Sequence, residues 1–219
     1  MKSKLFLSIF FSFLFVIGSS QTKENGLNLN LSFEDIQNGK PAVWYIYPQK
    51  NYSVSLDSVN VKSGKYSIAI EFIGDSAYFQ PVTITLPNNY EGKRMTLSGY
   101  IKTENVTGYA GLWMRIDPQL AFSDMPQLGI AGTTDWKRYE IAVDMNPAKT
   151  RQIVLGGLLA GTGKMWLDDL QITIDGKDIS EAKPYLFPAQ KDKEFDTGSN
   201  ITLFLFCLGL ISYLLIPRL

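Results

Sequence analysis

The sequence predicts an all-β sandwich, and three observations lead to this fold class. Short runs of alternating apolar and polar residues follow one another along the middle of the chain, each bounded by Gly, Pro, Asn or Asp. These runs do not show the 3.6-residue apolar period of an amphipathic helix. The 219 residues are 45% hydrophobic and 19% charged, which suits one globular domain with a substantial core.

Ten strands are expected along the chain. They cover residues 29–33, 44–47, 52–56, 66–72, 77–86, 95–102, 110–116, 137–145, 152–159 and 164–174. Turn signals rich in Gly, Pro, Asn and Asp separate several of them, at 38–41, 62–65, 87–89, 161–163 and 175–176. Alternation places Tyr66, Ile68, Ile70 and Phe72 on one face of their strand, and Tyr139, Ile141 and Val143 on one face of another. We expect these apolar faces to form the core.

The first twenty residues, 1–20, have the pattern of a secretory signal peptide. Lys2 and Lys4 precede an apolar run over 5–17, and small residues follow it at 18–20. An uncleaved membrane anchor is the alternative interpretation. Either way the sequence predicts an exported protein, periplasmic or extracellular.

A second apolar segment, 201–216, follows the polar, proline-containing stretch 180–200, which is expected to be a linker after a domain at 27–179. At about 1.5 Å per residue the segment would span roughly 24 Å, short of a hydrocarbon core of about 30 Å. With flanking residues it is a marginal transmembrane anchor for the inner membrane, and Arg218 would then lie on the cytoplasmic side. The alternative is that a shifted reading frame produced this tail.

Composition excludes several kinds of function. The chain has no histidine and one cysteine, Cys207, so it lacks the residues for Ser-His-Asp or Cys-His catalysis and for histidine-ligated zinc. The 21 basic and 21 acidic residues cancel, which argues against nucleic acid as a partner. Neighbouring acids such as Asp168 and Asp169 point to opposite faces of a strand and cannot flank one glycosidic bond. We therefore expect a protein that binds and does not catalyse.

The run 111–117 contains the sharpest candidate for a binding site. Alternation places its Leu, Met and Ile side chains toward the core, so Trp113, Arg115 and Asp117 project from the opposite face. An indole can cover the apolar face of a sugar ring while charged groups bind its hydroxyls. Tyr100 and Lys102 alternate outward in the same way and could extend this surface. The alternative is that Trp113 caps the edge of the core and Arg115 pairs with an acid.

Other aromatic residues gather at two places, 44–52 and 78–79. In sandwiches such clusters are mostly packing, so we expect them mainly in the core and in loops. Trp136 and Trp166 are also expected to be structural.

Four phrases of the chain carry a resemblance to a known family. They are SGKYSIAIEF, LSGYIKTENVTGYAGLWMRID, GTTDWKRYEIAVD and GKMWLDDLQITIDGKDI. Together they resemble the jelly-roll sandwich of galactose-binding-like domains and carbohydrate-binding modules. More specifically, they resemble the N-terminal domain of secreted bacterial C-terminal-processing (tail-specific) peptidases. The likeness covers roughly 27–200, and the chain departs from it where the peptidase domain would begin, so no peptidase residue carries over.

The resemblance also implies a structural calcium ion. In such modules an acid after the first strand, carbonyls of a Gly turn and the second acid of an Asp-Asp pair often hold calcium. Glu34, the turn Ser63-Gly64-Lys65 and Asp169 occupy these places here. Calcium prefers such a mixture of carboxylate and carbonyl oxygens. The alternative is that these are ordinary turn and surface acids.

Two functional hypotheses follow. The first is a non-catalytic exported module that binds glycan or cell-wall polysaccharide, tethered to the membrane through its C-terminal segment. The second is an accessory or remnant domain of a truncated or frameshifted tail-specific peptidase, which would bind a peptidase or another protein through an apolar patch.

Overall fold

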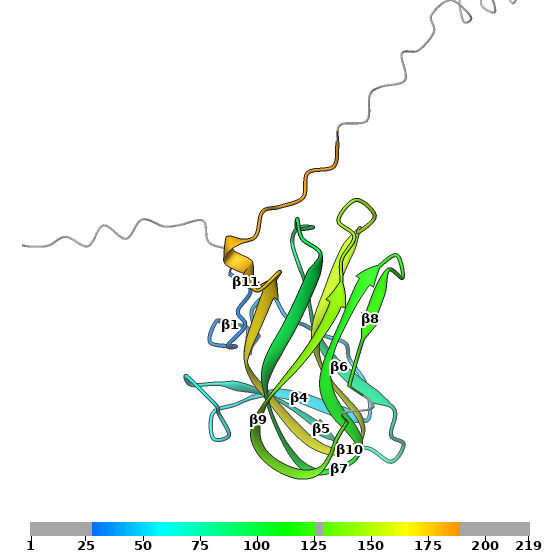
Figure 1. Cartoon of the computed structure of the whole chain (residues 1–219). Helices are drawn as coiled ribbons and strands as arrows, with labels where there is room; N and C mark the ends of the chain where they lie inside the picture. The colour runs from blue at the N-terminus through cyan, green and yellow to red at the C-terminus, as the bar shows by residue number, and fades with distance from the viewer. Residues whose placement is uncertain (1–27, 126–128, 189–219) are drawn as a thin grey trace, which may run out of the picture.

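The computed structural model describes residues 28–125 and 129–188, and these form an all-β jelly-roll sandwich (Figure 1). The expected signal peptide, the apolar tail and most of the expected linker lie outside the described residues. Within the part of the chain that is described, no helix has the length and apolarity needed to cross a membrane.

Nine strands hydrogen-bond as one antiparallel sheet that folds over on itself. They are β3 (Tyr45–Ile46), β4 (Tyr52–Asp57), β5 (Ser67–Phe72), β6 (Phe79–Thr85), β7 (Arg94–Asp117), β8 (Ala121–Ser123), β9 (Ile130–Asp144), β10 (Gln152–Ile174) and β11 (Lys177–Asp178). The short strands β1 (Ile36–Gln37) and β2 (Lys40–Pro41) form a separate hairpin. A single 3-10 turn, η1 (Ile179–Glu181), follows β11.

The two longest strands, β7 and β10, pair along their whole length and belong to both layers of the sandwich. The front sheet has the order β3, β6, β10 (152–162), β7 (107–117) and β8. The rear sheet has the order β4, β5, β10 (164–174), β7 (94–104) and β9. Figure 1 shows β7, β9 and β10 curving together where one layer passes into the other.

Glycines allow this curve. Gly161 lies opposite Gly108, and both have positive φ angles, 106° and 95°, which glycine adopts without steric cost. A Cβ atom on either residue would collide with a backbone carbonyl of the partner strand. The Tyr52 hydroxyl donates a hydrogen bond of 2.8 Å to the Gly161 carbonyl and fixes the curve from one side. The residues expected to form a turn at 161–163 are therefore a bend inside one strand.

That bend corrects the expected strand count. The runs 95–102 and 110–116 are one strand, β7, and the runs 152–159 and 164–174 are one strand, β10. In both cases the ladder continues through the interruption with a register shift, which is how a bulge lets a strand change direction without ending.

The core lies between the two sheets, and the lack of space around Gly157 shows how closely they pack. A Cβ atom on Gly157 of the front sheet would lie 2.6 Å from Cδ2 of Leu167 in the rear sheet. Ile68 and Ile70 are fully buried, and Ile141 and Val143 are nearly so, as their alternation predicts. Phe72 and Tyr139 are only partly buried and pack against the core from its edge. Tyr66 is also only partly buried and precedes β5, so its expected place in the core is wrong.

The strand expected at 29–33 is wrong, because this segment forms a turn. Asn30 and Phe33 have positive φ angles, 48° and 62°, which lie outside the extended region of a regular strand. The Asn30 side chain donates hydrogen bonds to the carbonyls of Asp35 (2.8 Å) and Ala42 (3.0 Å). Asparagine thus stabilises a local turn where its apolar neighbours suggested a strand.

The other expected strands are present with shifted ends. β4, β5 and β6 lie within a few residues of the expected 52–56, 66–72 and 77–86, and only Tyr45–Ile46 of 44–47 is a strand. β9 covers the expected 137–145 up to Asp144 but begins earlier, at Ile130. The short strands β1, β2, β8 and β11 are not among those expected.

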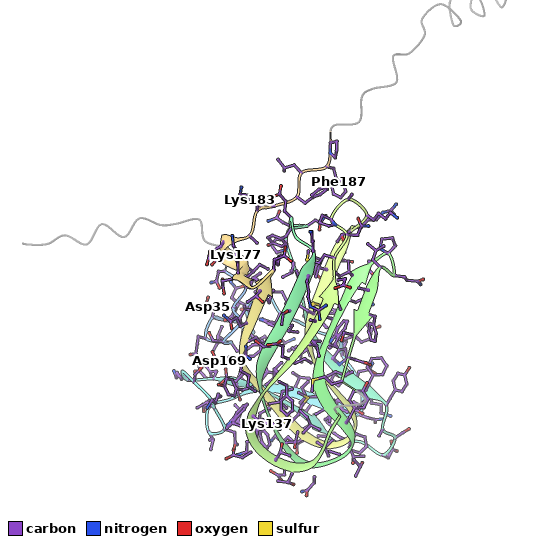
Figure 2. All side chains as sticks on the ribbon, in the orientation of Figure 1. Asp35, Lys137, Asp169, Lys177, Lys183 and Phe187 are labelled. Atoms are coloured by element: carbon purple, nitrogen blue, oxygen red, sulfur yellow. The ribbon has the colours of Figure 1, made fainter. Side chains whose placement is uncertain are left out.

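The described chain stays attached to the sandwich beyond β11. Pro184 pairs with Tyr90, the Tyr185 N–H donates to the Asn89 carbonyl (2.8 Å), and the Glu91 N–H donates to the Lys183 carbonyl (2.9 Å). Figure 2 shows Lys183 and Phe187 along this segment as it leaves the body. The first residues of the expected linker are therefore bonded to the domain.

Candidate functional site: an aromatic cleft on the front sheet

A cleft with a volume of about 740 Å³ lies on the outer face of the front sheet. The outward side chains of five strands and of their connecting loops line it. Its aromatic lining residues are Tyr45, Tyr47, Tyr78, Phe79, Tyr109, Trp113 and Phe122. Such an open surface is of the size and composition that proteins use for ligands with apolar faces.

The β register explains why Trp113 is central. Gly156 of β10 lies directly between Trp113 of β7 and Thr83 of β6, and Tyr45 of β3 lies opposite Thr83. Gly156 carries no side chain, so no side chain of β10 stands between the indole and Thr83. Leu158 lies two residues further along β10 and also lines the cleft. The floor of the cleft next to Trp113 is therefore apolar.

The rim of the cleft exposes an unusual amount of apolar surface. Tyr45, Tyr47, Tyr78 and Phe122 are 59%, 54%, 70% and 61% exposed. These are four of the ten large hydrophobic residues that the described chain exposes, and all four line one cleft. A soluble protein seldom gathers exposed aromatic side chains in one place without a ligand or partner for them.

Polar groups lie on both sides of Trp113 along β7, with Tyr109 four residues before the indole and Arg115 two residues after it. Arg115 pairs through Nε with Asp117, at 3.0 Å from Oδ1, and this pairing holds the guanidinium along β7. The Tyr109 hydroxyl donates a hydrogen bond of 3.2 Å to Oδ2 of Asp124. Burial, and then the neighbouring Asp124 charge, raise the pKa of Tyr109, so its hydroxyl stays a donor at neutral pH. A guanidinium, a carboxylate and a phenol therefore flank the aromatic floor.

The structure brings Trp113 and Arg115 together in the cleft, with Asp117 holding the arginine. Arg115 pairs with an acid, as the alternative interpretation expected. The indole Nε1 of Trp113 is buried without a hydrogen-bond partner among the described residues. Their role in binding stays a prediction.

Tyr100 and Lys102 do not extend this surface. They lie on the other half of β7, beyond the bend, and so project from the rear sheet. The Lys62 ammonium lies 4.5 Å from the Tyr100 ring centre, and the Lys102 ammonium donates to Asn60 Oδ1 at 3.1 Å. The expectation of one continuous surface is wrong because 95–102 and 110–116 lie on the two sides of the bend in β7 and so belong to different sheets.

Sequence reasoning assigned the aromatics at 44–52 and 78–79 mainly to packing, and this holds for only some of them. Trp44 and Tyr52 are buried, and the indole of Trp44 donates to the Asn30 carbonyl (2.9 Å). Tyr45, Tyr47 and Tyr78 line the cleft instead. The alternation through 44–47 could have indicated this, because it places Tyr45 and Tyr47 on the face of the strand opposite to Trp44. Phe122 carried no such signal, since β8 is only three residues long.

The residues proposed for calcium lie around the turn at 62–66. The carboxylates next to this turn already accept hydrogen bonds from its backbone N–H groups. Oε1 of Glu34 accepts hydrogen bonds from the N–H groups of Lys65 (2.9 Å) and Tyr66 (3.1 Å). Oδ2 of Asp168 accepts from the N–H groups of Lys62 (2.8 Å) and Ser63 (3.1 Å).

Asp169 is exposed and lines a different pocket, on the rear sheet. Within the described residues no three acidic, histidine or cysteine side chains group as metal ligands. The turn is therefore held by hydrogen bonds that need no cation, and the proposed ligands do not fit a calcium site well. Calcium stays a prediction, which melting temperatures in calcium and in EDTA would test.

Comparison with known proteins gives one relative in sequence and several in structure. No family model matches the chain. The chain is 35% identical over 126 residues to YbfP of Bacillus subtilis (strain 168), an uncharacterized HTH-type transcriptional regulator. The match covers 53% of this chain and 42% of YbfP, so the chain spans less than half of that relative.

The structural relatives include carbohydrate-binding modules. The CBM22-1 xylan-binding domain of Paenibacillus barcinonensis Xyn10C is 16% identical with a TM-score of 0.45, over 65% of this chain and 90% of that one. TmCBM61, solved with β-1,4-galactotriose, is 15% identical with a TM-score of 0.48, over 68% of this chain and 99% of that one. At such identities and TM-scores, neither likeness tells what this chain binds.

Proposed function

We propose that this protein is a non-catalytic module that binds carbohydrate in the aromatic cleft of its front sheet. The observation that carries the proposal is the convergence of Trp113 and four exposed aromatic side chains on one cleft with Arg115 and Asp124 beside them. Sugar rings present apolar C–H faces and polar hydroxyl edges, and this cleft offers a matching apolar floor with polar groups on either side of it.

The cleft lining suits binding and offers little for glycosidic hydrolysis. Asp124 is the one carboxylate among its lining residues, and it already accepts a hydrogen bond from Tyr109. Glycoside hydrolysis ordinarily needs a second carboxyl group about 5–9.5 Å away, across the scissile bond. The role of the cleft would therefore be to hold a saccharide and not to cleave it.

The test is binding of the full-length chain to a broad panel of oligosaccharides, measured by isothermal titration. Trp113→Ala should abolish binding of any saccharide that the wild type holds, because the indole provides the central apolar platform. Trp136→Ala is the matched control, since Trp136 lies on β9 outside the cleft and should leave affinity unchanged. No binding across the panel, or equal loss in both variants, would refute the proposal.

The cellular setting is part of the proposal. Residues 1–20 support export, and 201–216 support a tether at the inner membrane, where cell-wall polysaccharide would be within reach. Cell fractionation before and after deletion of 201–216 tests the tether. The partial match to YbfP fits a binding module that is joined to other domains elsewhere.

The second hypothesis keeps the same cleft but gives it a protein partner. A truncated or frameshifted tail-specific peptidase would leave this domain as an accessory module, and exposed aromatic side chains also suit protein interfaces. Copurification of a peptidase with the full-length chain from the native host would favour it. Translation of the gene in all three frames beyond the codon for Asn200 would show whether a peptidase continues in another frame.

A further inference from the structure

A second pocket lies on the rear sheet, on the opposite face of the sandwich from the aromatic cleft. Its volume is about 430 Å³, and Tyr100, Arg138, Asp169, Gln171 and Asp178 line it together with Leu170. In Figure 2 Asp169 lies on the left of the sandwich, whereas β8, at the edge of the cleft sheet, lies on the right in Figure 1. The aromatic cleft and this rear pocket share no lining residue.

The sheet register brings the side chains of the rear pocket together. Tyr100 of β7 pairs with Arg138 of β9 on one side and with Asp168 of β10 on the other. A bulge between Asp168 and Gln171 inserts one extra residue into β10 at this point. Asp169 lies in the bulge with a positive φ of 51°, a conformation that is uncommon outside glycine and that turns its side chain out of the strand's alternation.

The three charged side chains of the rear pocket differ in the partners that they already have. The Nη2 group of Arg138 donates a hydrogen bond of 2.6 Å to Ser98 Oγ, and its Nη1 group pairs with Oε2 of Glu140 at 3.5 Å, which together fix the guanidinium. Asp178 uses Oδ1 to accept from the backbone and hydroxyl of Ser180 at the start of η1. The Asp169 carboxylate, in contrast, makes no ion pair or hydrogen bond with another side chain of the described chain.

We infer that the rear pocket is a second saccharide site, which binds a single neutral sugar unit. A guanidinium and carboxylates in one small pocket oppose a simple anion and a simple cation alike. They suit a ligand whose neighbouring groups both donate and accept hydrogen bonds, as vicinal hydroxyls do. Asp169 accepts from one hydroxyl, Arg138 donates to the next, and the Tyr100 phenol and Gln171 carboxamide complete the polar wall.

Two sites on opposite faces would make the protein bivalent. One chain could hold two saccharide strands at once, with the cleft on one strand and the rear pocket on the other. Binding to a polymer that presents both ligands would then exceed the affinity of either site alone.

The experiment uses full-length Trp113→Ala protein, so that any saccharide binding in the aromatic cleft is removed and only the rear pocket is observed. Methyl glycosides of galactose, glucose, mannose and xylose are titrated against it by nuclear magnetic resonance. We expect shifts at Tyr100, Arg138 and Gln171 with at least one glycoside. Asp169→Asn in the same background should weaken that binding about tenfold, the value of one charge-assisted hydrogen bond.

Asp75→Asn is the matched control, because it removes the same charge from an exposed loop residue outside both sites. If Asp169→Asn alters the fold, which its melting temperature would show, Arg138→Gln serves instead. The inference is overturned if no glycoside shifts these residues, if Asp75→Asn weakens binding equally, or if calcium or a free amino acid binds there and the glycosides do not. None of these outcomes bears on the cleft, so the proposed function is tested separately.

Discussion

The indole N–H of Trp166 donates a hydrogen bond of 2.7 Å to Oδ2 of Asp57, joining β10 to the end of β4 on the outer face of the rear sheet. The backbone N–H groups of Val59 (2.7 Å) and Asn60 (3.0 Å) donate to the other carboxylate oxygen. Trp166 is 2% exposed, as expected for a structural residue. The ammonium groups of Lys102 and Lys164 lie 5.6 and 5.0 Å from its ring centre.

This relationship predicts an acid-dependent part of the stability. Burial alone would raise the pKa of Asp57, but the hydrogen bonds from Asn60, Trp166 and Val59 outweigh it and lower the pKa from 3.8 to about 2. Because the folded pKa is the lower one, the Asp57 contribution is complete above 3.8 and is lost as the pH falls toward 2. We expect Asp57→Asn to lower the free energy of unfolding at neutral pH, and we expect this loss to shrink as the pH falls.

Free energies of unfolding for wild type and Asp57→Asn, measured from neutral pH down to the acid limit of folding, check this. The difference between the two proteins should narrow across that window. A difference that stays constant with pH would show that the Asp57 carboxylate is not held in its ionised form by these donors.

Much of this fold could be predicted from the sequence, because alternation reports which side of a strand faces the core. The inward positions of β5 and β9 are examples. Alternation does not report where a strand ends, so Gly161 and Gly163 resembled a turn between two strands. Only the pairing with Gly108 and the hydrogen bond from Tyr52 show that the ladder continues through them.

The same limit explains the outcome for the site. Trp113, Arg115 and Asp117 share a strand face within five residues of sequence, and a local pattern predicts such a set. Tyr45, Tyr78 and Phe122 reach the cleft through long-range pairing of β3, β6 and β8 with the central strands. Sequence alone does not fix which strands become neighbours, so these contributors could not be assigned.

A second prediction concerns the buried carboxylate of Asp168, which is 0% exposed. Its Oδ2 accepts the N–H groups of Lys62 and Ser63 and its Oδ1 accepts that of Asp169, so Asp168→Ala would leave three donors without this partner. We expect a loss of about 1–3 kcal/mol for such groups, measured by urea unfolding. Asp169→Asn is the control and should change stability little, because its exposed carboxylate anchors nothing; equal losses would contradict the role given to Asp168.

The pKa of Asp168 gives this residue the opposite pH dependence from Asp57. Burial raises its pKa and outweighs the hydrogen bonds from Ser63, Lys62 and Asp169 that lower it. Folding therefore penalises its ionised form, and its contribution falls as the pH rises through the folded pKa. We expect the stability difference between wild type and Asp168→Asn to be larger in mild acid than at neutral pH, which the same unfolding series measures. A difference that grows with pH would contradict this sign.

Another prediction links the bend to the cleft through Tyr52. Its hydroxyl donates to the Gly161 carbonyl (2.8 Å) and accepts from the N–H of Tyr78 (3.0 Å), whose ring lines the cleft. Tyr52→Phe should cost about 1–3 kcal/mol of stability and should also weaken saccharide binding by loosening Tyr78. Tyr139→Phe is the matched control, because burial raises the pKa of Tyr139 but its hydroxyl makes no hydrogen bond within the described chain. Similar effects of both substitutions would refute the link.

The last prediction tests how closely the two sheets pack at Gly157. A Cβ atom there would lie 2.6 Å from Cδ2 of Leu167 and 3.6 Å from Cε of Met165, both in the opposite sheet. Gly157→Ala should therefore destabilise the protein by about 1–3 kcal/mol, the usual cost of overpacking a tight core.

Replacing Leu167 by Val removes the δ-carbons that the new methyl group would strike. Leu167→Val alone should also destabilise, because it leaves a small void. The double variant should then be more stable than the sum of the two losses predicts, since each change relieves the defect that the other creates. Additive losses in urea unfolding would mean that Gly157 and Leu167 do not touch across the core, and that the two sheets pack less closely here than this contact implies.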